Sequence, residues 1–385
     1  MSIDRDFVLQ TLTALVQTNS INPTLVPGSP GEAEIAVLTA TTMEAIGLEA
    51  TVHEPVPGRP SVVGRLGGQG GRRTLMLNAH YDTVGVENMD APFAATVRDG
   101  KLFGRGAYDM KGSLAACLAA AKALIDSGVQ LGGDLLIAAV ADEEYASLGT
   151  ADLLERYAAD AAIVTEPTEL EICVAHKGFI WLAVETWGRA AHGSRFDLGV
   201  DANMRMGRFL AELDLLEQTL RARPGHPLVG PPSLHAATLS GGTELSAYAA
   251  HCRLQIERRT VPGETETQVL AEIEEIIDRL AAADATFKAT LSPLFTRQPF
   301  EVNSDAAIVN DLRQSAEAIL ERTPPLVGQT PWMDAALLAE AGIETVVMGP
   351  SGGGAHATEE WVELDSVVAL AQLLAETARR TCGVV

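Results

Sequence analysis

Two helical stretches begin the chain, and from residue 61 to residue 165 short apolar runs typical of buried strands are interspersed with further helical stretches. The strand-like runs are 61–63, 74–77, 134–140 and 161–165; helical stretches are 4–18, 32–46, 113–125 and 147–157. Buried strands that are connected by helices form a largely parallel sheet with helices on its faces. We therefore predict an α/β fold with a mostly parallel sheet. Such sheets place ligand sites beyond the carboxyl ends of their strands.

The pattern changes after residue 178. The strand-like runs are then 179–184, 236–240 and 252–258, and the helical stretches are 199–220 and 264–283. Two strand–helix pairs in so short a segment predict a small α+β domain of the ferredoxin-like kind. The α/β pattern returns after Pro293, with helices at 305–321, 332–341 and 364–380 and a strand at 345–348. A chain of 385 residues is too long for one ordinary core. We predict a catalytic domain in two parts, 1–178 and 294–385, that is interrupted by an inserted domain, 179–293.

The overall charge of the chain excludes several kinds of partner. The net charge is −23 and the isoelectric point is near 4.7, with no compensating basic run. Such a surface repels nucleic acid and anionic membranes. The four cysteines are scattered and form no C-x-x-C pair, so we expect reduced thiols rather than a disulfide framework. The N-terminus lacks the basic and apolar segments of a signal peptide, and no apolar run reaches membrane-spanning length. We expect a cytoplasmic protein.

Five side chains in separate segments are candidate metal ligands. They are His80, Asp109, Glu144, Glu166 and His356. Imidazoles and carboxylates are the donors of two-metal hydrolases, in which one carboxylate can bridge two ions about 3.5–4 Å apart. Asp109 is the candidate bridge, because it lies in a glycine-flanked turn directly before the helix at 113–125. The alternative is that it only caps this helix or closes the turn.

Two further acidic residues accompany these ligands. Asp82, in the sequence His-x-Asp, can accept the second ring N–H of His80 and fix its tautomer; the alternative is an ordinary surface loop. Glu143 precedes Glu144 directly after a buried strand. One of the two can bind a metal while the other takes a proton from water, although a solvated acidic loop has the same sequence pattern. The ordered set, rather than any single residue, indicates a two-metal hydrolase.

These motifs resemble those of the M20 metallohydrolases, the group of acetylornithine deacetylase, succinyl-diaminopimelate desuccinylase, aminoacylase and carboxypeptidase G. The resemblance rests on residues 78–82, 104–112, 142–144, 165–168 and 355–360, in the family's order and over nearly the whole chain. It implies two divalent ions, zinc or else cobalt or manganese, with Asp109 as the bridge. It also implies that His80 and Glu166 complete the coordination of one ion, and that Glu144 and His356 complete the coordination of the other. By the same resemblance Glu143 is the general base and Asp82 supports His80.

The inserted segment resembles the lid of this family. Residues 188–194 match its lid histidine segment, so His192 is expected to stabilise the developing oxyanion. Residues 257–264 match the strand whose arginine, here Arg259, binds the substrate carboxylate, a task that suits the bidentate guanidinium group. In the family the inserted domain pairs two protomers and the lid histidine reaches the neighbouring site, which implies a homodimer. Residues 246–250 read Ser-Ala-Tyr-Ala-Ala where many members carry an asparagine, and this departure leaves the substrate open.

The expected reaction is attack of water on the amide carbonyl of an N-acyl amino acid. The Glu-Pro-Thr sequence at Glu166 favours deacylases over dipeptidases; a metallo-carboxypeptidase or dipeptidase of the same family is the alternative. A non-catalytic metal- or ligand-binding protein is a third interpretation, although the intact Glu143 argues against it. Gly104-x-Gly106 could belong to a dinucleotide fingerprint, but Asp109 stands where the third glycine would be.

Overall fold

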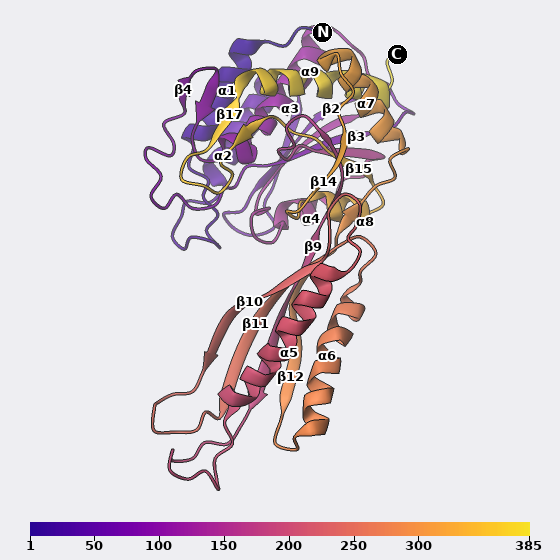
Figure 1. The fold of residues 1–385 in the computed structure, drawn as a ribbon. Helices are drawn as coiled ribbons and strands as arrows, with labels where there is room; N and C mark the ends of the chain where they lie inside the picture. Colours follow the sequence, from indigo (N-terminus) through magenta and orange to yellow (C-terminus); the bar gives the residue numbers. More distant parts are fainter. The chain divides into compact units, whose positions relative to one another are not determined.

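A computed structural model describes residues 1–385, and in it the apolar runs of the first half become neighbouring strands of one sheet (Figure 1). The strand order is β1 (Glu49–His53), β2 (Ser61–Leu66), β6 (Leu135–Val140), β3 (Leu75–His80), β7 (Ala161–Val164), β15 (Glu344–Val347) and β8 (Ile172–His176). The chain divides into two units. The first comprises 1–174, 302–327 and 333–385, and the second comprises 175–301 and 328–332.

The centre of this sheet is parallel and its flanks are antiparallel. β3 pairs in parallel with β6 and with β7, and β15 pairs in parallel with β7. β2 runs antiparallel to β6, and β1 runs antiparallel to β2. Every residue of β3 and β6 is buried, as expected for parallel strands that are covered on both faces. The predicted α/β class is confirmed.

Helices of the first unit lie on both sides of the sheet. They are α1 (Arg5–Gln17), α2 (Ala33–Ala45), α3 (Gly112–Asp126), α4 (Leu148–Leu154), α7 (Ala307–Leu320), α8 (Ala335–Glu340) and α9 (Leu364–Thr381). From β3 the chain moves in one direction along the sheet to β6, and from β6 it moves back to β7. Right-handed crossovers therefore place α3 and α4 on opposite faces (Figure 1). None of the helices combines the length and apolar character needed to cross a membrane.

A second, small sheet lies beside the turn that carries Asp109. Its order is β16 (Gly352–Gly353), β17 (Trp361–Glu363), β5 (Lys101–Phe103) and β4 (Thr96–Arg98), all antiparallel. Directly after β5 the chain forms the irregular helical turn η1 (Ala107–Lys111). This sheet brings the segment before Asp109 next to the segment that contains His356. Its strands are too short to have been predicted from the sequence.

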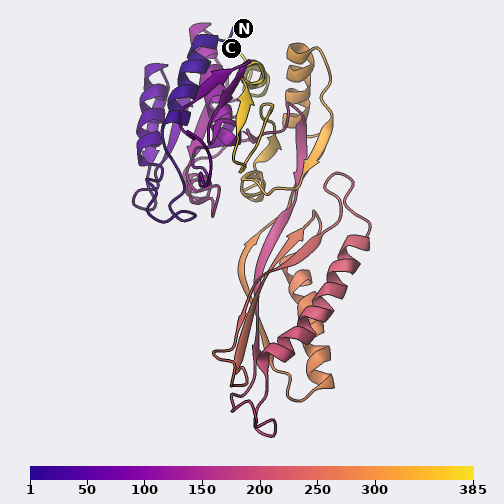
Figure 2. The same ribbon diagram turned by 60° about the vertical axis from the view of Figure 1, so that its left-hand side comes forward.

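The second unit has the ferredoxin-like order. It contains β9 (Gly178–Trp187), α5 (Ala202–Ala222), β10 (Ser233–Gly241), β11 (His251–Thr260), α6 (Glu266–Ala283) and β12 (Ala289–Arg297). The strand order is β10-β11-β9-β12, with every pair antiparallel. α5 and α6 lie on one side of this sheet (Figure 2), where Ile180, Leu182 and Val184 of β9 belong to the buried core. The predicted α+β architecture is confirmed.

The last strand of this unit differs from the sequence interpretation. The sequence pattern predicts no strand at 289–297 and ends the inserted domain at Pro293, whereas the structure places Pro293 inside β12, next to an irregularity in register. β12 is an edge strand, and an edge strand tolerates proline since no neighbour needs its missing N–H. The large sheet described above also contains the short strands β13 (Phe300–Glu301) and β14 (Leu326–Gln329), which both pair with β8. The domain boundaries drawn at residues 178 and 293 stay predictions.

Candidate metal centre

The candidate ligands come from segments that meet at one edge of the parallel strands. His80 is the last residue of β3, Glu143–Glu144 follows β6, and Glu166 follows β7. Because these strands are parallel neighbours, their carboxyl ends bring the side chains to the same place. Asp109 comes from η1, and His356 comes from the loop between β16 and β17.

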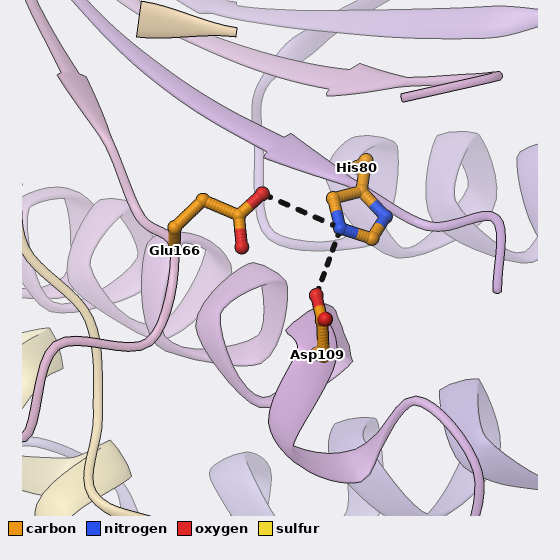
Figure 3. A group of neighbouring side chains, drawn as sticks. All are labelled: His80, Asp109 and Glu166. Atoms are coloured by element: carbon orange, nitrogen blue, oxygen red, sulfur yellow. Dashed lines mark hydrogen bonds and ion pairs between the residues drawn. The ribbon is translucent and has the colours of Figure 1, made fainter. Parts of the chain in front are cut away.

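One group of donors consists of His80, Asp109 and Glu166 (Figure 3). His80 Nε2 lies 3.1 Å from Asp109 Oδ1 and 3.4 Å from Glu166 Oε1. The imidazole and the Glu166 carboxylate are buried, and Asp109 is half-buried. The three ligand atoms lie within 4.8 Å of one another, close enough to bind one metal ion.

A second group shares Asp109 with the first. His356 Nε2 lies 3.4 Å from Asp109 Oδ2 and 3.0 Å from Glu144 Oε2. Asp109 therefore turns Oδ1 toward one group and Oδ2 toward the other, which is how a bridging carboxylate is placed. The His356 side chain is 55% exposed, so this side of the group is open to solvent. Together the two groups contain the five residues that the sequence motifs indicate.

The electrostatics of the two groups suit bound cations. Burial raises the pKa of Glu166 well above its ordinary value, and the charge of Asp109 adds to this shift. Burial by itself would lower the pKa of His80, but the carboxylates of Glu166 and Asp109 raise it well above the usual range. Contacts with Asp109 and Glu144 raise the pKa of His356 to about 10. Three clustered carboxylates with two imidazoles form a donor set that fits divalent metal ions, whose charge would offset the repulsion.

Glu143 lies beside the first group but is a member of neither. Its Oε2 is 4.0 Å from His80 Nε2. Burial raises its pKa well above the ordinary value, and the charge of Glu166 contributes to the shift. A carboxylate that adjoins the ligands without being one of them can take a proton from water in the site. Its role as general base stays a prediction.

Asp82 links the ligand strand to the acidic pair. Its Oδ1 accepts a hydrogen bond from the Glu143 backbone N–H (3.1 Å), and its Oδ2 accepts one from the Glu144 N–H (3.3 Å). His80 Nδ1 lies 3.0 Å from the Asp82 main-chain carbonyl oxygen but 3.7 Å from its carboxylate. The main-chain carbonyl, rather than the expected carboxylate, is thus within hydrogen-bonding distance of the ring. The carboxylate instead holds the loop that carries Glu143 and Glu144.

Comparison with known proteins decides the family. Residues 76–380 match the model of peptidase family M20/M25/M40. The chain belongs to this family. The resemblance that the sequence motifs indicated is therefore confirmed.

This M20 chain is similar to two curated relatives and to one solved structure. It is 31% identical to an N-formyl-4-amino-5-aminomethyl-2-methylpyrimidine deformylase of Halalkalibacterium halodurans, over 93% of the chain and 91% of the relative. It is 32% identical to an acetylornithine deacetylase of Myxococcus xanthus, over 82% of the chain and 83% of the relative. The crystal structure of aminopeptidase PepT from Bacillus cereus matches with a TM-score of 0.81 at 20% sequence identity, over 98% of this chain and 99% of that structure's chain. These relationships make the M20 chain a hydrolase of amide or peptide bonds.

Sequence reasoning gave no role to Glu360, although this residue ends the last recognised motif. Its buried carboxylate accepts hydrogen bonds from the backbone N–H groups of Gly106 (3.0 Å), Tyr108 (2.9 Å) and Asp109 (3.0 Å), and from the Arg105 guanidinium (2.6 Å). Gly106 has a left-handed φ of 79°, and a Cβ there would lie 2.7 Å from Thr83 Cγ2. Glu360 and this glycine fix the turn that presents Asp109. The acidic pair 359–360 beside His356 was the available signal.

Asp334 was also missed. Its side chain is buried, and Oδ2 accepts a hydrogen bond from Thr150 Oγ1 (2.5 Å), which in turn accepts one from Asn78 Nδ2 (3.0 Å). Its charge contributes to the raised pKa of Glu143 and of Glu166. An isolated aspartate before a helix carries no sequence signal for such a position.

His192 and Arg259 lie in the second unit, whereas the five ligands, Glu143 and Asp82 lie in the first. His192 is exposed, and its Nδ1 lies 2.8 Å from Ser194 Oγ. The backbone of this loop pairs with the unusual segment 246–250, through a bridge between His192 and Ala247. The Arg259 guanidinium forms an ion pair with Glu257 at 2.6 Å and lies 5.3 Å from the centre of the Phe179 ring.

Proposed function

We propose that this M20 chain is a two-metal amidohydrolase that removes the acyl group from N-acyl amino acids. The observation that carries the proposal is the placement of Asp109, whose two carboxylate oxygens face two separate donor groups. The two curated relatives support removal of an acyl group from nitrogen, because one is named a deacetylase and the other a deformylase, and the name of the deacetylase supports an N-acyl amino acid as substrate. We expect zinc at both positions, with cobalt or manganese as alternatives. The four cysteines are buried, and a cytoplasmic location remains our expectation.

The positions of the side chains support the roles that we propose for them. His80 and Glu166 would hold one ion and Glu144 and His356 the other, with Asp109 shared. When bound, such ions act as Lewis acids that polarise a carbonyl oxygen and lower the pKa of water. Glu143 would accept the proton of the attacking water and pass it to the departing amine nitrogen. This transfer leaves Glu143 ionised again for the next cycle.

The second unit would contribute to substrate binding. Arg259 can exchange its pairing with Glu257 for a bidentate contact with the substrate carboxylate. His192 would donate a hydrogen bond to the carbonyl oxygen as negative charge develops there. Its exposure fits a residue that meets a substrate or another protomer, and we propose that it acts across a homodimer formed by the inserted domain.

The proposed activity is tested with a panel of substrates. We expect the purified enzyme to hydrolyse N-acetyl, N-formyl or N-succinyl amino acids with a higher kcat/KM than unblocked dipeptides of the same side chains. Replacing the substrate carboxylate by a carboxamide should lower kcat/KM, because Arg259 would lose its bidentate partner. Preferential cleavage of the dipeptides would show that the protein is a peptidase instead. An enzyme without activity on either series, while binding metal, would favour a non-catalytic binding protein.

The dimer is tested by complementation. His192→Ala and Glu143→Ala proteins should each be inactive, and mixing them under conditions that exchange subunits should restore activity. Each mixed dimer regains one complete site, with Glu143 from one chain and His192 from the other. Random pairing makes about half of the dimers mixed, so activity should approach roughly a quarter of the wild-type value. The control is the same mixture kept under conditions without exchange. If exchange is demonstrated by mass spectrometry and activity stays absent, His192 does not act in trans.

A further inference from the structure

A buried charged network lies behind the Glu143–Glu144 pair and contains none of the metal-binding candidates. Its members are Asn22, Glu32, Arg59, Asp82 and Asp142. They come from four separate segments of the first unit, and all five are buried. Buried charges cost several kcal/mol each unless they are paired. Of its members, only Asp82 is among the site residues that the sequence motifs indicate.

Arg59 is the only cation of the network. Its Nε donates to Glu32 Oε2 (2.6 Å), while Nη2 donates to Glu32 Oε1 (2.7 Å) and to Asp142 Oδ1 (2.6 Å). The side chain of Arg59 is 7% exposed, and those of Glu32 and Asp142 are fully buried. Burial raises the pKa of Glu32 to about 7, despite the hydrogen bonds from Arg59. One guanidinium therefore ties two buried carboxylates together with fork geometry, which lysine does not reproduce.

Asn22 extends the network to Asp82. Its Nδ2 donates to Asp142 Oδ1 (3.0 Å) and to Asp82 Oδ2 (2.8 Å). The Asp82 carboxylate in turn accepts hydrogen bonds from the backbone N–H groups of Glu143 and Glu144. An unbroken chain of hydrogen bonds therefore leads from Arg59 to the backbone of both glutamates.

Asp142 is the point at which this chain meets the catalytic loop. It directly precedes Glu143 and has a left-handed φ of 70°, a conformation that non-glycine residues keep where their surroundings enforce it. Its carbonyl oxygen accepts hydrogen bonds from the N–H groups of Tyr145 (3.3 Å) and Ala146 (3.0 Å). Arg59 thus holds the one residue whose backbone directs the chain from β6 into the Glu143–Glu144 pair.

We infer that Arg59 is a positioning residue for this pair: through Asp142, Asn22 and Asp82 it fixes the direction of the Glu144 ligand and of Glu143. The inference rests on the proposed two-metal function. Without Arg59, three buried carboxylates would face one another without a cation. Asp142 would then turn away, and the backbone contacts of Asp82 with Glu143 and Glu144 would be lost with it.

Arg59→Lys and Arg59→Met test the inference, with Arg65→Met as the matched control. Arg65 lies on β2 and also pairs with two carboxylates, Glu49 and Asp134, but on the surface and away from the network. Substitution of a residue that orients metal ligands typically lowers the metal affinity by about 10–100-fold. We expect both Arg59 variants to bind zinc about 10–100-fold more weakly, measured by competition with a chromophoric chelator. We also expect a lower kcat with little change in KM, while Arg65→Met keeps the wild-type values.

A purely structural role would lower only the melting temperature. The variant Asn22→Ala distinguishes a structural role from a positioning role. It breaks the link between Asp142 and Asp82 but leaves the ion pairs of Arg59 intact, and removing the neutral Asn22 side chain leaves no charged group without its ion-pair partner. We expect it to weaken zinc binding in the same direction even if the Arg59 variants do not fold. Wild-type zinc affinity and kcat in folded Asn22→Ala or Arg59→Lys protein would overturn the inference. If the wild-type protein binds no zinc, cobalt or manganese, the proposed function itself has failed, and the two failures are distinguished.

Discussion

Glu143→Ala is expected to lower kcat by about 10²–10⁴-fold while both metal ions stay bound. The reason is geometric: Glu143 adjoins the first donor group, 4.0 Å from His80 Nε2, but belongs to neither group. Its removal takes away the proton acceptor and leaves all five donors in place. The measurement combines steady-state kinetics with metal content by elemental analysis on the same preparation.

The neighbouring residue provides the matched control. Glu144→Ala removes a side chain that lies 3.0 Å from His356 Nε2 in the second donor group. We expect this variant to lose one metal ion as well as activity. If instead Glu143→Ala loses metal and Glu144→Ala retains it, the roles of the two residues are exchanged. Equal kcat for Glu143→Ala and wild type would exclude Glu143 as the base.

The positions of the main ligands could be predicted because strand ends carry them. The apolar runs predicted at 74–77, 134–140 and 161–165 form the adjacent parallel strands β3, β6 and β7, so the polar residues that follow each run had to meet. Local sequence shows where a strand ends, and the parallel arrangement brings the carboxyl ends of neighbouring strands to the same edge of the sheet. His80, Glu144 and Glu166 were therefore accessible to sequence reasoning.

The supporting network could not be predicted in the same way. Arg59 is 27 residues from Glu32 and 83 from Asp142 along the chain, and no periodic pattern relates such positions. Each of the three also has an ordinary surface interpretation in an acidic protein. Their burial is decided by how the loops before β2 and after β6 pack, which is a tertiary property. Asp334 was missed for the same reason.

Short and irregular elements were lost for a different reason. The helix expected at 332–341 begins only at Ala335 in the structure, because Trp332 and Met333 precede it in an irregular segment. Strands of two or three residues, such as β16 and β17, are too short for alternation to be recognised. They matter nevertheless, because β17 joins β5 and so brings the His356 loop toward Asp109.

Removal of metal is expected to abolish activity, and Asp109 should be the residue on which both ions depend. Dialysis against a strong chelator should give an inactive protein, and zinc, cobalt or manganese should restore activity as two equivalents bind. Asp109 offers one oxygen to each donor group, with Oδ1 3.1 Å from His80 Nε2 and Oδ2 3.4 Å from His356 Nε2. Asp109→Ala should therefore weaken both ions, whereas His356→Ala should weaken only the one it shares with Glu144. Calorimetric titration of the metal-free proteins distinguishes these results. Two tightly bound ions in Asp109→Ala would refute the bridge, and full activity in protein shown to be metal-free would refute metal dependence altogether.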